Sequence, residues 1–143
     1  METMTQTNNV LYTARTLTKG GRENGSAKSS DGRLDIKLST PGKQGTGTNP
    51  EQLFAAGWSA CFEGAMAIGA QKMHVQLPED TAIAAEVDLL FDKTNGYSLT
   101  ARLNISLPGL NKDVVRDIVD FAHANCPYSK AIRGNVEVEI NLV

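Results

Sequence analysis

The chain has 143 residues, of which 41% are hydrophobic and 21% charged, and this composition is typical of a folded globular protein and excludes a disordered or collagen-like chain. Its 14 Lys and Arg against 16 Asp and Glu give a net charge of -2, so no general electrostatic attraction draws it to nucleic acid or to an anionic membrane. We expect a single domain over residues 1–143, with a flexible N-terminus at residues 1–9.

From the sequence we expect neither a signal peptide nor a membrane span. Its first residues are polar and lack the basic start and apolar core of a secretion signal. The apolar stretch from Leu53 to Phe62 stops at Glu63, short of the about 18 to 20 apolar residues that a spanning helix needs. We therefore expect a cytoplasmic protein, in which two cysteines are free, metal-bound or catalytic rather than joined in a static structural disulfide.

The N-terminal third reads as strands separated by flexible segments. Residues 11–18 favour a strand, and residues 19–25 form a turn-rich stretch with three glycines. Apolar and charged residues alternate over 33–38, which predicts a half-buried strand, and residues 41–47 form a flexible loop.

A long helix is expected next. Thr48 or Asn49 is suited to cap it, Pro50 suits its first turn, and Glu51 favours the positive end of its dipole. The helix body is rich in Ala and Gly and has almost no charged face, which predicts a central helix buried nearly all round. One small sheet and one further helix offer too little cover for it, so we expect a homodimer.

The C-terminal half begins with a β-hairpin. Residues 83–91 and 97–107 alternate at period two around a turn, and Asn111 is suited to cap a second helix that ends near Asn125. Residues 136–142 form a last strand. Hairpins instead of strand–helix–strand repeats predict an α+β fold with antiparallel sheets.

The two cysteines occupy different environments. Cys61 lies more than three turns into the long helix, about 18 Å from its start, where the dipole has no effect on the thiol. Apolar surroundings should raise its pKa, so a reactive Cys61 requires a cation from elsewhere, for which arginine is the best donor. Cys126 sits at the C-terminal end of a helix, where the dipole disfavours a thiolate. Cys61 is therefore the better first nucleophile and Cys126 the better second thiol; the structural alternative is that both are small core residues.

Other chemistries are weakly indicated. His123 and Cys126 have a spacing seen in metal sites, but only Cys61 and His74 remain as soft ligands and there is no C-x-x-C, so we expect no metal. The chain also lacks the G-x-S-x-G, Walker and G-x-G-x-x-G motifs.

Two long segments, Thr48–Phe62 (TNPEQLFAAGWSACF) and His123–Val136 (HANCPYSKAIRGNV), closely resemble the two cysteine motifs of the organic hydroperoxide resistance proteins in the OsmC/Ohr family. The Gly20–Arg22 loop and residues 29–41 match as well, and the likeness spans almost the whole chain beyond its first ten residues. The Cys-Pro-Tyr-Ser block and the Gly-Gly-Arg loop favour this branch over the related osmotically induced proteins.

The resemblance implies a thiol peroxidase that reduces organic hydroperoxides (alkyl, aryl and fatty-acid) and is recycled by dihydrolipoamide on lipoylated proteins, with no bound cofactor. Cys61 matches the peroxidatic cysteine, and Cys126 the resolving cysteine that forms a disulfide with it. Arg22 matches the arginine that holds the thiolate, and Glu51 the carboxylate that orients this arginine. The family fold is an intertwined homodimer with central helices flanked by sheets.

Glu51 also fits a capping box with Thr48, which is the structural alternative to a catalytic role. Glu51 and Cys61 lie about 15 Å apart along a straight helix, so one arginine head cannot touch both groups. Either the helix is broken between them, or the arginine and carboxylate come from the partner subunit. We favour a site shared at the dimer interface.

Apolar residues near the cysteines are candidates for a hydroperoxide slot, with plain core as the alternative for each: Phe54, Trp58, Phe62, Met66 and Phe121. Two other functions stay open. An apolar-ligand carrier would use the cysteines only as lining, and a redox sensor would pass a disulfide to a partner, although the sequence shows neither a DNA-binding helix nor a basic patch.

Overall fold

The computed structural model describes residues 9–143, so the flexible N-terminus predicted over residues 1–9 lies almost wholly outside the described residues. The chain divides into two compact units, Met1–Asn49 and Pro50–Val143.

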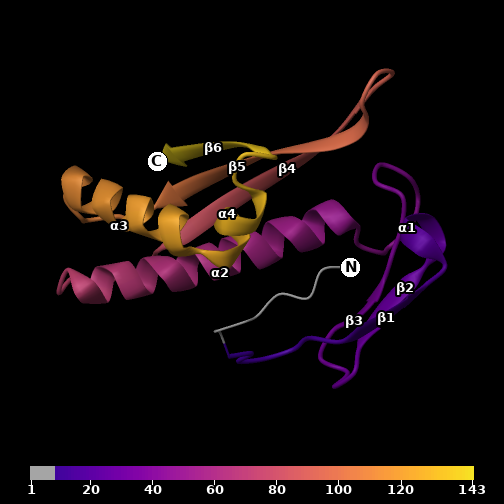
Figure 1. The fold of residues 1–143 in the computed structure, drawn as a ribbon, viewed down its shortest axis with the longest axis horizontal. Coiled ribbons are helices and arrows are strands. Elements are labelled where there is room, and N and C mark those ends of the chain that lie inside the picture. The colour runs from indigo at the N-terminus through magenta and orange to yellow at the C-terminus, as the bar shows by residue number, and fades with distance from the viewer. Residues whose placement is uncertain (1–8) are drawn as a thin grey trace. The chain divides into compact units, whose positions relative to one another are not determined.

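The first unit is a small antiparallel sheet in the order β1-β2-β3, with β1 at Thr16–Lys19, β2 at Ser26–Ser29 and β3 at Asp35–Lys37. A short helical turn, α1 at Gly21–Asn24, connects β1 to β2 (Figure 1). The alternating residues at 33–38 are confirmed as a strand, and the strand predicted at residues 11–18 is confined to its C-terminal end. Strand β2 was not predicted because Ala27 is its single apolar residue, which leaves no alternating pattern to detect.

The second unit contains three helices and three strands (Figure 1): α2 (Pro50–Lys72), β4 (Ala82–Asp92), β5 (Gly96–Ser106), α3 (Lys112–Asn125), α4 (Pro127–Ile132) and β6 (Glu137–Leu142). The predicted long helix, hairpin, second helix and last strand are all confirmed. The Asn111 cap is confirmed too, because its Oδ1 accepts a hydrogen bond of 2.8 Å from the Asp113 backbone N–H. The six-residue helix α4 was not predicted.

The second sheet has the order β4-β5-β6 and is only partly antiparallel. β4 and β5 pair antiparallel from Ala82↔Ser106 to Asp92↔Gly96, as the hairpin predicts. β6 pairs parallel to β5, and here the antiparallel expectation is wrong. The chain crosses over through α3 and α4 before β6 begins, so β6 runs in the same direction as β5, as in a strand–helix–strand unit.

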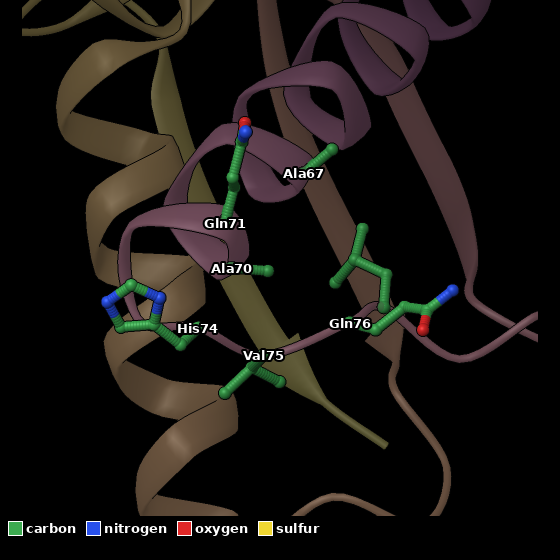
Figure 2. Close-up of a pocket in the computed structure, with 7 residues that line it drawn as sticks. Ala67, Ala70, Gln71, His74, Val75 and Gln76 are labelled. Atoms are coloured by element: carbon green, nitrogen blue, oxygen red, sulfur yellow. The ribbon is translucent and has the colours of Figure 1, made fainter.

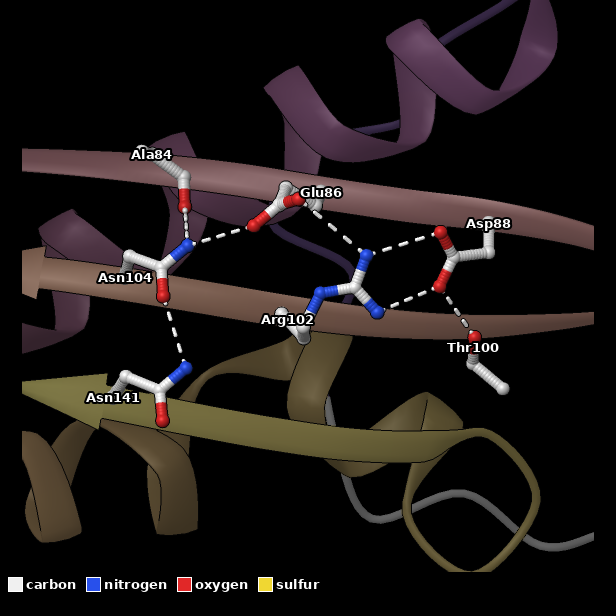
Figure 3. A network of polar contacts seen from close by, with 7 residues as sticks. All are labelled: Ala84, Glu86, Asp88, Thr100, Arg102, Asn104 and Asn141. Atoms are coloured by element: carbon white, nitrogen blue, oxygen red, sulfur yellow. Dashed lines mark hydrogen bonds and ion pairs between the residues drawn. The ribbon is translucent and has the colours of Figure 1, made fainter.

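The two faces of this sheet differ in polarity. Ala101, Leu103 and Ile105 of β5 are buried and belong to one hydrophobic core with residues of α2 and α3. The opposite face carries a polar network (Figure 3). In it, the Arg102 guanidinium donates to both carboxylate oxygens of Asp88, at 2.7 and 3.0 Å. This network and the alternation along β5 set the hairpin register.

Helix α2 is covered on one side only. Its fully buried side chains include Trp58, Phe62 and Met66, whereas Ile68 is 53% exposed. The second unit by itself therefore does not bury the helix nearly all round, and that expectation depends on the homodimer predicted to supply the remaining cover. By length and composition α2 could cross a membrane, which the stop at Glu63 did not lead us to expect. Its buried aromatic residues identify it as the core helix of this unit.

Candidate functional site

The second unit brings the two cysteines together. Cys61 lies on α2 and is half-buried, Cys126 joins α3 to α4 and is fully buried, and both thiols are free. The Cys126 thiol is close enough to Cys61 to form a hydrogen bond with it. The pairing expected from the sequence thus has the proximity that it requires.

Burial and two neighbouring groups shift the pKa of Cys61. Burial raises the pKa of this thiol, a hydrogen bond with the Cys126 thiol raises it further, and a hydrogen bond with the backbone of Tyr128 lowers it. The net change is upward, as expected for a thiol in apolar surroundings.

The unpredicted helix α4 changes the helix-dipole environment expected for Cys126. Cys126 is the C-cap of α3 and also the N-cap of α4, so the negative end of one helix dipole and the positive end of another meet there. The Tyr128 backbone group that acts on Cys61 belongs to the first turn of α4. The available signal for this helix was Pro127, since proline is favoured at the first helical position.

A cluster of aromatic side chains holds α4 against α2. The Trp58 indole Nε1–H donates a hydrogen bond of 3.1 Å to the Ser129 Oγ, and both side chains are fully buried. The Phe54 ring lies edge-on to Trp58 and to Tyr128, at 6.0 and 6.1 Å between ring centres. Gly57 allows this approach, because a Cβ there would lie 2.7 Å from the Tyr128 Oη.

A pocket of about 480 Å³ opens beside Cys61, between α2 and the residues where α3 passes into α4. Its lining is mostly apolar or small: Cys61, Gly64, Ala65, Ile68, Lys72, Phe121, Asn125 and Pro127. Phe121 enters this surface because Gly69 leaves room for it, since a Cβ at Gly69 would lie 2.6 Å from the Phe121 Cδ1. Gly57 and Gly69 show the close approach that glycine allows in a helix that it otherwise destabilises.

Of the predicted slot residues, Phe121 is the one that lines this pocket. Trp58, Phe62 and Met66 are fully buried in the core, and Phe54 is half-buried against it. The sequence did not single out Ile68 and Lys72, which also line the pocket. Their signal was the helical spacing 61, 64/65, 68, 72, which puts all of them on one face of α2.

The structure does not bring Glu51 to Cys61. Helix α2 runs unbroken from Pro50 to Lys72, with Glu51 in its first turn, so the two residues are separated by about 15 Å of helix. This excludes the broken helix that was one of the two sequence-based alternatives. Arg22 lies in α1 of the first unit.

His123 is part of the core boundary. Its ring lies 6.4 Å from that of Phe62, and burial lowers its pKa, with the positive charge of Arg133 acting in the same direction and Asp120 opposing it. The Arg133 guanidinium also donates to the His123 carbonyl at the end of α3. Within residues 9–143, no group of three or more His, Cys, Asp or Glu side chains is arranged to hold a metal ion.

A larger pocket, of about 650 Å³, lies at the C-terminal end of α2 (Figure 2). His74 adopts a left-handed conformation there, with φ of 58°, and the Val75 N–H donates to the Ala70 carbonyl at 2.8 Å, which ends the helix. The pocket is lined by Ala, Gln, Val, Leu and His74 and contains no cysteine. We therefore regard the Cys61 pocket as the candidate active site.

Comparison with known proteins gives consistent matches. The family model described as OsmC-like protein matches residues 30–141. An organic hydroperoxide resistance protein of Xanthomonas axonopodis pv. citri is 47% identical over 137 residues, which cover 93% of this chain and 95% of that protein. The crystal structure of OhrB of Bacillus subtilis superposes with a TM-score of 0.87 at 39% identity, covering 94% of this chain and 100% of that one.

A crystal structure of an organic hydroperoxide resistance protein from Legionella pneumophila superposes with a TM-score of 0.86 at 42% identity, covering 94% of this chain and 98% of that one. These matches confirm the α+β class and the OsmC/Ohr-like fold expected from the sequence.

Proposed function

Because the chain belongs to the OsmC/Ohr family of organic hydroperoxide resistance proteins, we propose that it is a cysteine peroxidase that reduces organic hydroperoxides to alcohols. The observation that carries this proposal is the contact between Cys61, beside a mostly apolar pocket, and the buried thiol of Cys126. This arrangement places the peroxidatic thiol beside both the resolving thiol and a pocket for an apolar substrate.

In the first step, the Cys61 thiolate attacks the outer oxygen of the hydroperoxide. The sulfur–oxygen bond forms as the oxygen–oxygen bond breaks, the alkoxide takes up a proton and leaves as the alcohol, and Cys61 becomes a sulfenic acid. The Tyr128 N–H stabilises the thiolate before the attack. Because burial raises the pKa of Cys61, this one donor is not sufficient, and a cation is also required.

We infer that Arg22 supplies this cation and that Glu51 orients it. Since α2 is unbroken between Glu51 and Cys61, the carboxylate beside a given thiolate comes from a second copy of the chain. The active protein is then a homodimer with a shared site.

The tip of the β4–β5 hairpin extends past the part of β5 that pairs with β6 (Figure 1). Phe91 and Tyr97 near this tip are 63% and 73% exposed, and such exposed aromatic side chains are typical of a surface that a partner covers. Light scattering should give twice the chain mass; a monomer that retains full activity would contradict the shared site.

In the second step, the Cys126 thiol condenses with the Cys61 sulfenic acid, which releases water and forms a disulfide. This protects Cys61 from further oxidation. A dithiol must then reduce the disulfide by exchange. We infer that dihydrolipoamide on a lipoylated protein does so in a reducing cytoplasm. Both cysteines return to thiols, and the lipoyl group becomes a cyclic disulfide.

Free-thiol titration before and after one equivalent of an alkyl hydroperoxide tests this function. Two thiols per chain should be lost in the wild type. Cys61→Ser should abolish peroxide consumption, whereas Cys126→Ser should still reduce one equivalent of peroxide. No thiol loss with the wild type would refute the peroxidase and favour an apolar-ligand carrier. A redox sensor is distinguished by the lack of sustained turnover with dihydrolipoamide.

A further inference from the structure

The pocket beside Cys61 extends along one face of α2 and ends at a lysine. Cys61 and Lys72 are eleven residues apart, about three helical turns, so they face nearly the same direction about 16 Å apart along the axis. Ala65 and Ile68 lie on the same face between them, and all four residues line the one pocket. We call this surface the Cys61–Lys72 groove.

Lys72 is held at its end of the groove. Its Nζ lies 5.3 Å from the centre of the Phe121 ring, in the range of a cation–π contact. Phe121 has its position because Gly69 leaves room for its ring. A lysine head that would otherwise move freely is therefore restrained next to the apolar surface.

The charge of Lys72 is not neutralised locally. Within residues 9–143, no acidic side chain forms an ion pair with Lys72, and the described residues that line the groove include no carboxylate. The groove thus combines a reactive thiol at one end, an apolar middle and an unneutralised cation at the other end.

We propose that Lys72 binds the anionic end group of an apolar hydroperoxide whose peroxide group lies at Cys61. This inference rests on the proposed function and specifies its substrate: a free fatty-acid hydroperoxide bound through its carboxylate. A pocket of about 480 Å³ favours a single acyl chain over a two-chain lipid with a phosphate headgroup. Lys72 is then a specificity residue and takes no part in the reaction at sulfur.

The test compares a fatty-acid hydroperoxide with its methyl ester, which has the same chain and peroxide group without the negative charge. The rate constant for Cys61 oxidation should fall about threefold to fivefold for the free acid in Lys72→Gln, the size expected for one partly exposed ion pair. The rate with the ester should not change. Lys72→Arg should retain the preference for the acid, since it keeps the charge.

Lys112→Gln is the matched control, because it removes the same charge from the exposed first turn of α3, outside the groove and away from the hairpin tip. It should leave both rates unchanged. An equal fall with the acid and the ester in Lys72→Gln would show a structural role and overturn the proposal. No change with either substrate in Lys72→Gln would overturn it as well. So would a higher rate constant for Cys61 oxidation with a vesicle-bound phospholipid hydroperoxide than with the free acid.

A second measurement separates this inference from the peroxidase function. A saturated fatty acid, which carries no peroxide group, should protect Cys61 from alkylation by iodoacetamide, and its methyl ester should protect less. Lys72→Gln should remove this difference. If protection follows this pattern but no hydroperoxide is consumed, the anion subsite stands and the peroxidase proposal fails. If hydroperoxides are consumed but the acid and the ester protect Cys61 equally, the peroxidase proposal stands and the anion subsite fails.

Discussion

The buried hydrogen bond between Trp58 and Ser129 should stabilise the protein measurably. Both side chains are fully buried, and Ser129 is the one buried polar residue in the core of the part of the chain that the structure describes. Ser129→Ala removes the acceptor and leaves the indole N–H buried without a partner. Such a loss costs about 1–3 kcal/mol, so we expect about 2 kcal/mol less free energy of unfolding.

Urea unfolding at a fixed protein concentration is the assay, because dimerisation would make the midpoint depend on concentration. With an m-value of about 2 kcal/mol/M, a loss of about 2 kcal/mol lowers the midpoint by about 1 M. Ser59→Ala is the matched control. Its Oγ donates to the Ala55 carbonyl of its own helix, at 2.7 Å, and its removal should change stability by less than about 0.5 kcal/mol.

A double-mutant cycle with Trp58→Phe isolates the hydrogen bond from the packing. Each single variant leaves one buried polar atom without its partner, whereas the double variant leaves neither. The double variant should therefore lose about 1 kcal/mol less than the sum of the two single losses. Additive losses, or a Ser129→Ala variant as stable as the wild type, would show that this contact does not hold α4 on α2.

Two further predictions concern the surroundings of Cys61. Gly57→Ala should destabilise the protein, although Ala favours a helix, because the added Cβ would lie 2.7 Å from the Tyr128 Oη. Gly64→Ala should stabilise it by about 0.5–1 kcal/mol, because an added Cβ there would contact no other part of the structure within 4 Å. Equal effects of the two substitutions on urea unfolding would contradict this contrast. Cys126→Ala should lower the pKa of Cys61, because the Cys126 thiol raises it, so the pH profile of Cys61 alkylation by iodoacetamide should move to lower pH; an unchanged profile would refute the contact.

The sequence predicts the elements whose signals are local. The alternation over β4 and β5 specifies a hairpin, because side chains at period two face a single core. Asn111 and Pro127 bound α3, since a cap and a proline act within one turn of the chain. Elements without such a local pattern were missed: β2, with its single apolar residue, and α4, which has only six residues.

The tertiary structure decided which residues meet. The parallel pairing of β6 depends on a crossover that no local pattern encodes. The hydrogen bond from Trp58 to Ser129 joins residues 71 positions apart, and it turned a predicted slot residue into part of the core. The sequence ranked Cys61 over Cys126 from the helix dipole at the end of α3, and the start of α4 at the same residue places an opposing dipole end there. The donor at Tyr128 and the groove that ends at Lys72 emerge only when α4 and α3 pack on α2, because contacts between distant segments arise from the folded chain as a whole.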